Sequence, residues 1–121
     1  MLAAARARIE RLEPADALEA VREGALLVDI RSEPQRHRDG VVPGAVYHPR
    51  NVLEWRMDPD SGHNDPAVGG HDRRVIVVCN EGYQSSLAAA TLRDIGFARV
   101  ADLEGGFQAW RGAGLPVEPI D

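Results

Sequence analysis

The feature that most constrains the fold is a short apolar run that ends at the only cysteine of the chain. Residues 74–78 (RVIVV) contain no polar residue after Arg74, which is typical of a strand buried on both faces of a parallel sheet. Cys79 follows directly, and a helical pattern begins at Ser85 or Ser86. A buried strand, a tight loop and a helix in this order predict an α/β fold.

Similar short apolar runs alternate with helical patterns along the whole chain. Strands are predicted at residues 9–12, 26–30, 45–47, 74–78 and 99–103. Helices are predicted at residues 15–23, 34–38, 85–95 and 106–112. The longest predicted loop covers residues 58–70, which hold three glycines and two prolines. This alternation favours a mostly parallel sheet flanked by helices.

The helical periodicity also predicts which side chains are buried. Phe107 and Trp110 lie three residues apart on one side of the last helix and are expected to be core aromatics. The helix over residues 85–95 is expected to bury one face, formed by Leu87, Thr91, Leu92 and Ile95.

Length and composition point to one domain. The chain has 121 residues, of which 44% are hydrophobic and 27% charged, as is ordinary for a globular protein. The domain is expected to span residues 9–118, between a short N-terminal arm at residues 1–8 and a C-terminal tail at residues 119–121. The first residues lack the apolar run of a signal peptide, and no stretch is apolar enough to cross a membrane. A cytoplasmic location is therefore expected.

Charge and metal-ligand spacing exclude several classes of function. The net charge of −5 argues against a nucleic-acid partner. A single cysteine cannot form an internal disulfide, so no oxidising compartment is implied. The histidines show no metal-ligand spacing, so neither a metal site nor a cofactor is predicted. These histidines are His37, His48, His63 and His71.

The position of Cys79 predicts a reactive sulfur. Ligand sites of parallel α/β sheets lie outside the carboxyl ends of the strands, which is where Cys79 is expected. A tight loop that leads into a helix turns backbone N–H groups inward, and the helix N-terminus adds positive potential. Gly82 provides the conformational freedom that such a loop needs. Together these features would stabilise a thiolate and a persulfide anion. The alternative is a small buried hydrophobic residue that ends a strand.

Four motifs, in order along the chain, resemble those of the rhodanese family of sulfurtransferases. Residues 28–31 (VDIR) look like its Asp-x-Arg element, and residues 42–45 (VPGA) like its Ile/Val-Pro-Gly-Ala turn. Residues 79–86 stand where that family has its active-site loop, and residues 103–110 (LEGGFQAW) match its Gly-Gly-Phe/Tyr-x-x-Trp signature. The resemblance implies a single domain with a five-stranded parallel sheet flanked by helices. It also implies sulfur transfer through a cysteine persulfide.

The candidate site consists of Cys79 as the catalytic residue and a set of substrate-binding residues. Arg31 follows a strand on the ligand side of the sheet, where it either pairs with Asp29 or lends positive potential to the cysteine. Arg50 and Arg56 follow the third strand and either overhang the pocket or are solvated surface charges. The predicted substrate-binding residues are Asn80, Glu81, Gly82, Tyr83, Gln84, Ser85, Arg31 and Arg50.

The loop after Cys79 lacks the basic residues that thiosulfate-using members of the rhodanese family often carry there. It contains no arginine or lysine, and Glu81 would repel a dianion such as thiosulfate if it points inward. A protein persulfide or a low-molecular-weight persulfide is therefore at least as plausible a donor. The loop also excludes a phosphatase of this fold, since the arginine of the Cys-x5-Arg motif, which clamps a tetrahedral oxyanion, is replaced by Ser85.

The predicted reaction is a double displacement. The Cys79 thiolate takes the outer sulfur of a donor and passes it from the resulting persulfide to a thiophilic acceptor. Donor and acceptor, a small-molecule or protein persulfide and a thiol, must come from outside, because no second cysteine is present. The protein would act as a monomer or homodimer. The alternative is a non-catalytic rhodanese-like binding or redox-sensing module, with Trp55 and the segment 52–57 as a docking surface.

Overall fold

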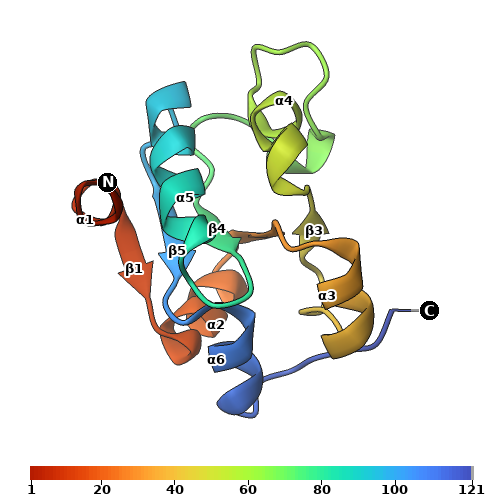
Figure 1. Ribbon diagram of the computed structural model, residues 1–121. Helices are drawn as coiled ribbons and strands as arrows, with labels where there is room; N and C mark the ends of the chain where they lie inside the picture. The colour runs from red at the N-terminus through yellow and green to blue at the C-terminus, as the bar shows by residue number, and fades with distance from the viewer. Residues whose placement is uncertain (121) are drawn as a thin grey trace.

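Five parallel strands form the centre of the molecule, and helices cover both faces of the sheet (Figure 1). The computed structural model describes residues 1–120. From one edge of the sheet to the other, the strands are β1 (Glu10–Leu12), β5 (Val100–Leu103), β4 (Val75–Val78), β2 (Leu26–Asp29) and β3 (Val46–Tyr47). Every neighbouring pair is parallel. The predicted α/β fold with a five-stranded parallel sheet is confirmed.

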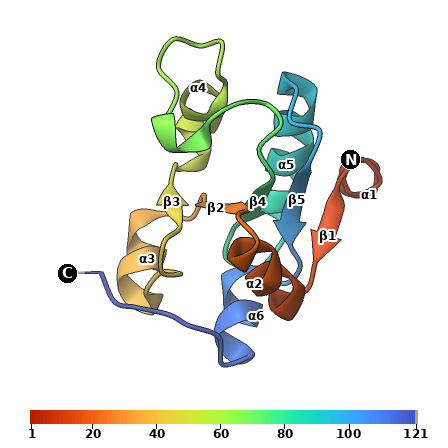
Figure 2. The ribbon, with the colours of Figure 1, turned by 180° about the vertical axis from the view of Figure 1, so that it is seen from behind.

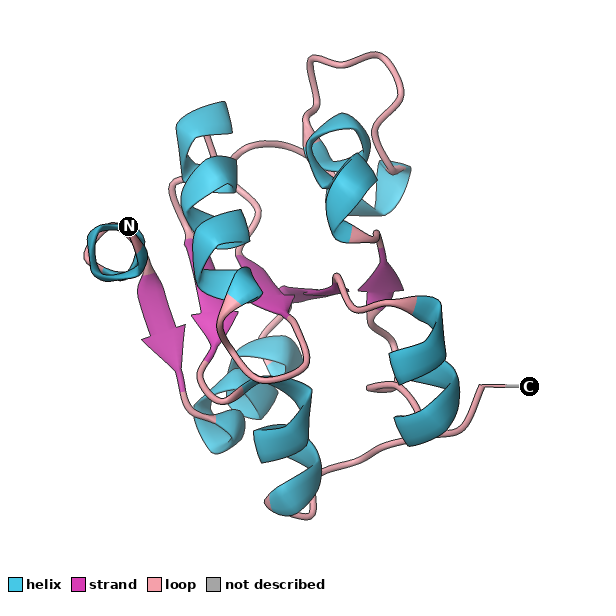
Figure 3. Ribbon diagram, in the orientation of Figure 1, coloured by secondary structure: helices cyan, strands magenta, loops and turns pink. Residues whose placement is uncertain are grey.

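The helices are divided between the two faces of the sheet. They are α1 (Leu2–Arg6), α2 (Pro14–Arg22), α3 (Glu33–Asp39), α4 (Leu53–Met57), α5 (Gln84–Ile95) and α6 (Gly106–Gly112). Two 3-10 turns, η1 (Arg50–Val52) and η2 (Pro66–Val68), lie in the connections. Helices α4 and α5 pack on one face, and α2 and α6 on the other (Figures 2 and 3). The predicted strands and helices are all present, with ends that differ by at most one residue.

The central strand β4 explains why the sheet is buried on both sides. Val75 and Val77 belong to the core under α4 and α5, whereas Ile76 and Val78 belong to the core under α2 and α6. Successive side chains of a strand point to opposite faces, so an uninterrupted apolar run serves both cores. This strand ends at Cys79, which is 7% exposed.

Helix α5 turns a face to the sheet that only partly matches the one that its large side chains predicted. Leu92 is fully buried as expected, but Leu87, Thr91 and Ile95 are only partly buried. The buried residues of α5 are Ser85, Ser86, Ala88, Ala89, Ala90 and Leu92. Small side chains let the helix lie close to the sheet. The predicted face was therefore correct for Leu92 and in part for Ile95, which packs against the core, but it missed the small buried residues.

The N-terminal residues, expected as an arm, form a helix instead. Helix α1 packs against α5 beside the edge strand β1 (Figure 1). Ala5 is buried there. Arg6, at the end of α1, donates from Nε to the hydroxyl of Ser86 at 3.0 Å. The first residues thereby contact the start of α5, next to the Cys79 loop.

The aromatic residues of α6 are buried as predicted. Phe107 and Trp110 are 0% and 1% exposed, and both belong to the core under α2 and α6. The indole N–H of Trp110 donates to the carbonyl of Pro116 at 2.8 Å, which fastens the C-terminal segment to the domain. None of the helices within residues 1–120 has the length and apolar character needed to span a membrane.

Candidate active site

Cys79 lies at the carboxyl end of β4, in a loop that bends back over its sulfur. Its Sγ accepts a hydrogen bond from the backbone N–H of Gly82 at 3.1 Å. Gly82 adopts a φ of +87°, which side-chain-bearing residues rarely occupy. A Cβ at this position would lie 2.8 Å from the backbone nitrogen of Gly105, so only glycine fits without displacement. The loop therefore owes its shape to Gly82.

A shallow pocket of about 320 Å³ opens beside the sulfur. Its lining residues are Ile30, Arg31, Ser32, Gln35, Cys79, Asn80, Glu81, Tyr83 and Gln84. Five of the residues predicted to bind substrate are among them, namely Arg31, Asn80, Glu81, Tyr83 and Gln84. Gly82 and Ser85 are buried and do not line the pocket. Ser32 and Gln35, which begin α3 across the pocket from the loop, were not predicted.

Asp29 and Arg31 form the buried ion pair that was one of the two interpretations of this motif. Arg31 Nη2 lies 2.8 Å from Asp29 Oδ2 and also donates to the carbonyl of Gly40 at 2.7 Å. The guanidinium stacks 3.8 Å above the centre of the Phe107 ring. Its remaining nitrogen, Nη1, is buried and has no hydrogen-bond partner in the described part of the chain. Arg31 thus combines a structural ion pair with a place in the pocket wall.

Neither arginine that follows β3 is among the residues that line the pocket. Arg50 Nη1 pairs with Glu54 Oε1 at 2.8 Å, one helical turn further along the chain. Arg56 Nη1 donates to the carbonyl of His63 at 2.8 Å. These local partners hold both side chains near their own segment, so the structure does not bring Arg50 to the Cys79 pocket.

Two other arginines lie behind the loop, and sequence reasoning missed them. Arg6 Nη2 and Arg11 Nη2 both donate to the carbonyl oxygen of Gly82, at 3.0 and 3.2 Å. Arg6 comes from α1 and Arg11 from β1, more than seventy residues before the loop. No local pattern in the sequence signals such a contact, because it depends on how α1 and the edge strand pack.

Asp102 is fully buried and connects Arg11 to the start of α5 through hydrogen bonds. Its Oδ2 accepts hydrogen bonds from the hydroxyls of Ser85 and Ser86 at 2.9 and 2.8 Å. Its Oδ1 accepts one from Arg11 Nε at 2.9 Å. The hydrogen bond that Arg11 donates to Asp102 is the main cause that raises the pKa of Arg11 above its ordinary value. Ser85, predicted to bind substrate, therefore points into this network.

Helix α6 also stabilises the Cys79 loop through backbone hydrogen bonds. The N–H groups of Phe107 and Gln108 donate to the carbonyls of Cys79 and Asn80, at 2.8 and 3.1 Å. A Cβ on Gly106 would lie 2.7 Å from the Cys79 carbonyl oxygen, so glycine is required for this close approach. The Gly-Gly-Phe motif thus positions the cysteine loop in addition to supplying a core aromatic.

Glu81 is exposed at the rim of the pocket. Its Oε1 accepts a hydrogen bond from Asn80 Nδ2 at 3.3 Å. The Asn80 Oδ1 accepts another from Gln108 Nε2 at 3.0 Å. The carboxylate that was expected to repel a dianion is therefore turned toward its neighbour and solvent at the rim.

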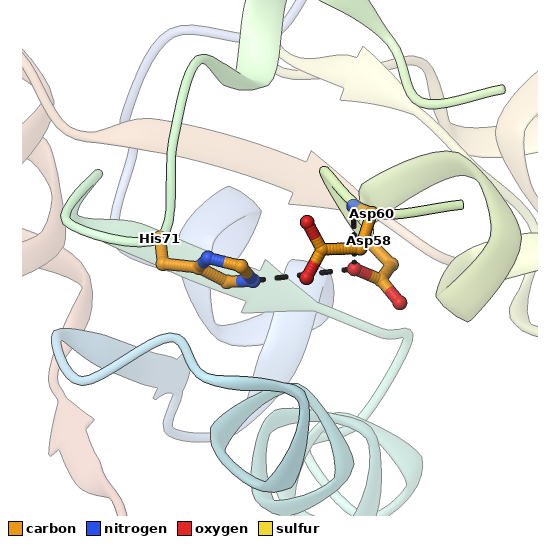
Figure 4. Close-up of side chains that lie close together, drawn as sticks. All are labelled: Asp58, Asp60 and His71. Carbon is orange, nitrogen blue, oxygen red and sulfur yellow. Dashed lines mark hydrogen bonds and ion pairs between the residues drawn. The ribbon is translucent and has the colours of Figure 1, made fainter. Parts of the chain in front are cut away.

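A second group of polar side chains gathers away from this pocket. One ligand atom each of Asp58, Asp60 and His71 lies within 4.8 Å of the others (Figure 4). His71 is half-buried, and its ring packs edge-on against that of Phe97, with 5.4 Å between the ring centres. Its Nε2 is 4.0 Å from Asp58 Oδ1, and Asp60 is exposed.

A cysteine at the end of a central parallel strand, with a backbone N–H directed at its sulfur, has the geometry to hold an anion at that sulfur. Comparison with known proteins identifies the family. Residues 13–113 match the family model described as rhodanese-like domain. The chain belongs to the rhodanese-like family.

Its relatives are consistent with this family. A sulfurtransferase from Allochromatium vinosum is 36% identical over 95 residues, which cover 78% of this chain and 79% of the relative. The thiosulfate sulfurtransferase GlpE of Pseudomonas entomophila is 35% identical over 103 residues, 84% of each chain. A solved structure from Rhodopseudomonas palustris superimposes with a TM-score of 0.88 at 40% identity, covering 97% of this chain and 90% of that one. It is described as a protein of unknown function and a possible tyrosine phosphatase.

Proposed function

We propose that the protein is a sulfurtransferase that carries sulfane sulfur as a persulfide on Cys79. The observation that supports this most is the hydrogen bond of 3.1 Å from the Gly82 N–H to the Cys79 sulfur. A backbone donor aimed at sulfur stabilises an anion there, as thiolate or as persulfide. Two of the relatives named above, from Allochromatium vinosum and Pseudomonas entomophila, are named sulfurtransferases, which agrees with this assignment.

The reaction proceeds in two displacements on sulfur. With thiosulfate as donor, the Cys79 thiolate attacks the outer sulfur, the S–S bond of thiosulfate breaks, and sulfite leaves with the electron pair. The enzyme is left as Cys79–S–S⁻. A nucleophile such as cyanide or a thiolate then attacks the outer sulfur and releases the original thiolate. Charge and atoms balance in both steps, and no external oxidant or reductant is needed.

Thiosulfate is proposed as the first donor to test. The loop itself has no cation, but Arg6 and Arg11 stand behind it and Arg31 lines the pocket. A thiosulfate dianion would lie near positive charge with Glu81 turned to the rim. A protein or low-molecular-weight persulfide remains the alternative donor, and a thiol of another molecule the acceptor, because Cys79 is the only cysteine.

A phosphatase activity, suggested for the relative from Rhodopseudomonas palustris, does not suit this site. Arginine-dependent catalysis on this type of loop needs a guanidinium six residues after the cysteine to clamp the phosphate oxygens. That position is Ser85, whose buried hydroxyl donates to Asp102. Incubation with p-nitrophenyl phosphate is expected to release no nitrophenol above the background of Cys79→Ser.

The alternative of a non-catalytic binding module rests on exposed aromatic surface. Trp55 is 50% exposed and its ring lies 5.0 Å from that of His63. This surface lies on α4, and it does not include the Cys79 pocket. A module that only bound a partner there would not require a sulfur with a backbone donor, so the structure favours catalysis.

Steady-state kinetics with thiosulfate and cyanide test the proposal. The expected result is thiocyanate formation with parallel double-reciprocal lines, as a two-step exchange through an enzyme-bound sulfur requires. Cys79→Ser is expected to abolish it. Thiocyanate formation that persists in Cys79→Ser would overturn the proposal.

Assembly and cellular location also remain proposals. We propose a monomer or homodimer that works in the cytoplasm, where thiol acceptors stay reduced. Size-exclusion chromatography with light scattering distinguishes these assemblies from larger ones.

A further inference from the structure

The carbonyl of Gly82 links the sulfur of Cys79 to positive charge on the far side of the loop. It accepts hydrogen bonds from Arg6 Nη2 at 3.0 Å and from Arg11 Nη2 at 3.2 Å. The N–H of the same residue donates to Cys79 Sγ at 3.1 Å. Gly82 thus makes contact with the sulfur on one side and with two guanidinium groups on the other.

The peptide bond between Gly82 and Tyr83 fixes the direction of the Tyr83 N–H relative to the Gly82 carbonyl. All described peptide bonds are trans, so the N–H of Tyr83 points opposite to the carbonyl of Gly82. Donors that hold the Gly82 oxygen behind the loop therefore turn the Tyr83 N–H away from the arginines. The N–H of Gln84, the first residue of α5, has no acceptor within the helix, whereas that of Ser86 donates to the Tyr83 carbonyl at 3.3 Å. The N–H groups of Tyr83 and Gln84 are then available to an anion bound at Cys79.

The two arginines differ in how far their charges are neutralised. Arg11 pairs with the buried Asp102 at 2.9 Å. Arg6 forms no ion pair with any residue in the range 1–120, although it is partly buried. The Coulomb interaction with Cys79 is the smallest of the causes that raise the pKa of Arg11, after the larger effect of Asp102. Arg11 therefore lies close enough to Cys79 for its charge to act on the sulfur. Arg6 binds the same Gly82 carbonyl oxygen as Arg11 and supplies the uncompensated charge.

We propose that Arg6 and Arg11 are positioning residues of the Cys79 loop, which hold its N–H groups toward the sulfur anion and provide the cationic charge that residues 80–84 lack. This inference deepens the proposed function, and its test below is independent of sulfur transfer. It also gives the N-terminal helix a role, because α1 carries Arg6 to the loop. Neither arginine touches the pocket, so both act through Gly82.

The test compares alkylation of Cys79 by a neutral and an anionic reagent. Iodoacetamide and iodoacetate react with the same sulfur, so the ratio of their rate constants at pH 7 and low salt reports the local potential. The variants are Arg6→Met, which keeps length and removes charge, and Arg6→Lys, which restores charge. Arg8→Met is the matched control, because Arg8 lies in the same segment but pairs with Asp94 on the surface.

We expect the ratio of the two alkylation rate constants to fall only in the variant that loses the charge of residue 6. In Arg6→Met the ratio of the iodoacetate to the iodoacetamide rate constant is expected to fall about two- to fourfold, as for removal of one charge near the sulfur. Arg6→Lys is expected to recover most of the ratio, and Arg8→Met to match the wild type. Loss of packing alone would slow or speed both reagents without changing their ratio.

Two outcomes would overturn the inference: an unchanged ratio in Arg6→Met, or an equal fall in Arg8→Met. Thermal unfolding of each variant verifies that the compared proteins are folded. Sulfur loading is measured on the same samples. A wild-type protein that never loads sulfur refutes the proposed function, whereas the alkylation ratio decides the role of Arg6 by itself.

Discussion

Replacement of Gly82 by alanine should damage the site more than the fold. The φ of +87° at this position costs a side-chain-bearing residue about 1–2 kcal/mol. In addition, the new Cβ would lie 2.8 Å from Gly105 N and 3.2 Å from Gly105 Cα, which are backbone atoms that cannot rotate away. Relief of this contact moves the loop and lengthens the 3.1 Å hydrogen bond from Gly82 to the sulfur.

The size of the effect follows from that hydrogen bond. A hydrogen bond to a charged group contributes about 1.5–3 kcal/mol, so its loss should slow persulfide formation by about 10- to 100-fold. Gly62→Ala is the matched control. Gly62 has a similar φ of +79°, but nothing lies within 4 Å of an added Cβ. That variant should lose about 1 kcal/mol of stability and load sulfur at the wild-type rate.

Rapid mixing with thiosulfate, quenched at short times and analysed by mass, gives the loading rates, and urea denaturation gives the free energies of unfolding. If Gly82→Ala loaded sulfur as fast as Gly62→Ala, the Gly82 N–H would have no part in stabilising the sulfur anion. The reasoning from this contact would then be refuted.

Three further changes test the surrounding structure. The hydrogen bond from Arg38 lowers the pKa of Asp39 to about 2, below the value of this carboxyl group in the unfolded chain. The contribution of Asp39 to stability is therefore full above about pH 4 and is lost as the pH falls toward 2. The free energy of unfolding of Asp39→Asn should depend less on pH between 4 and 2 than that of the wild type. Asp102→Asn leaves Arg11 without its buried partner and should lower the free energy of unfolding by about 1–3 kcal/mol, measured in urea; an unchanged midpoint would contradict the network. Trp110→Phe removes the 2.8 Å hydrogen bond to Pro116 and should cost about 1–2 kcal/mol, while persulfide formation on the folded protein stays as in the wild type.

Local patterns were sufficient for the elements that carry the cysteine. The apolar run of β4, the loop with Gly82 and the start of α5 follow from periodicity and turn chemistry within about twenty residues. The ion pair between Arg50 in η1 and Glu54 in α4 is also local, because the two residues are four positions apart, and it could have been predicted. It explains why Arg50 stays with its own helix.

The support of the loop could not be predicted in this way. Arg6 and Arg11 meet Gly82 across separations of 76 and 71 residues, and Asp102 meets Ser85 and Ser86 from another strand. These contacts depend on the order of strands in the sheet, which places β1 beside β5 and α1 beside α5. The buried face of α5 was only partly predicted for a related reason, since burial followed closeness to the sheet and not the size of the side chains.

The most direct test is the mass of the protein after incubation with thiosulfate and removal of excess reagent. A persulfide adds one sulfur atom, about 32 Da, to the chain, and peptide mapping should place it on Cys79, the thiolate that performs the displacement. The account predicts this adduct in the wild type, its absence in Cys79→Ser, and its disappearance on addition of cyanide. Wild-type protein that gains no sulfur from thiosulfate, polysulfide or a protein persulfide would contradict it.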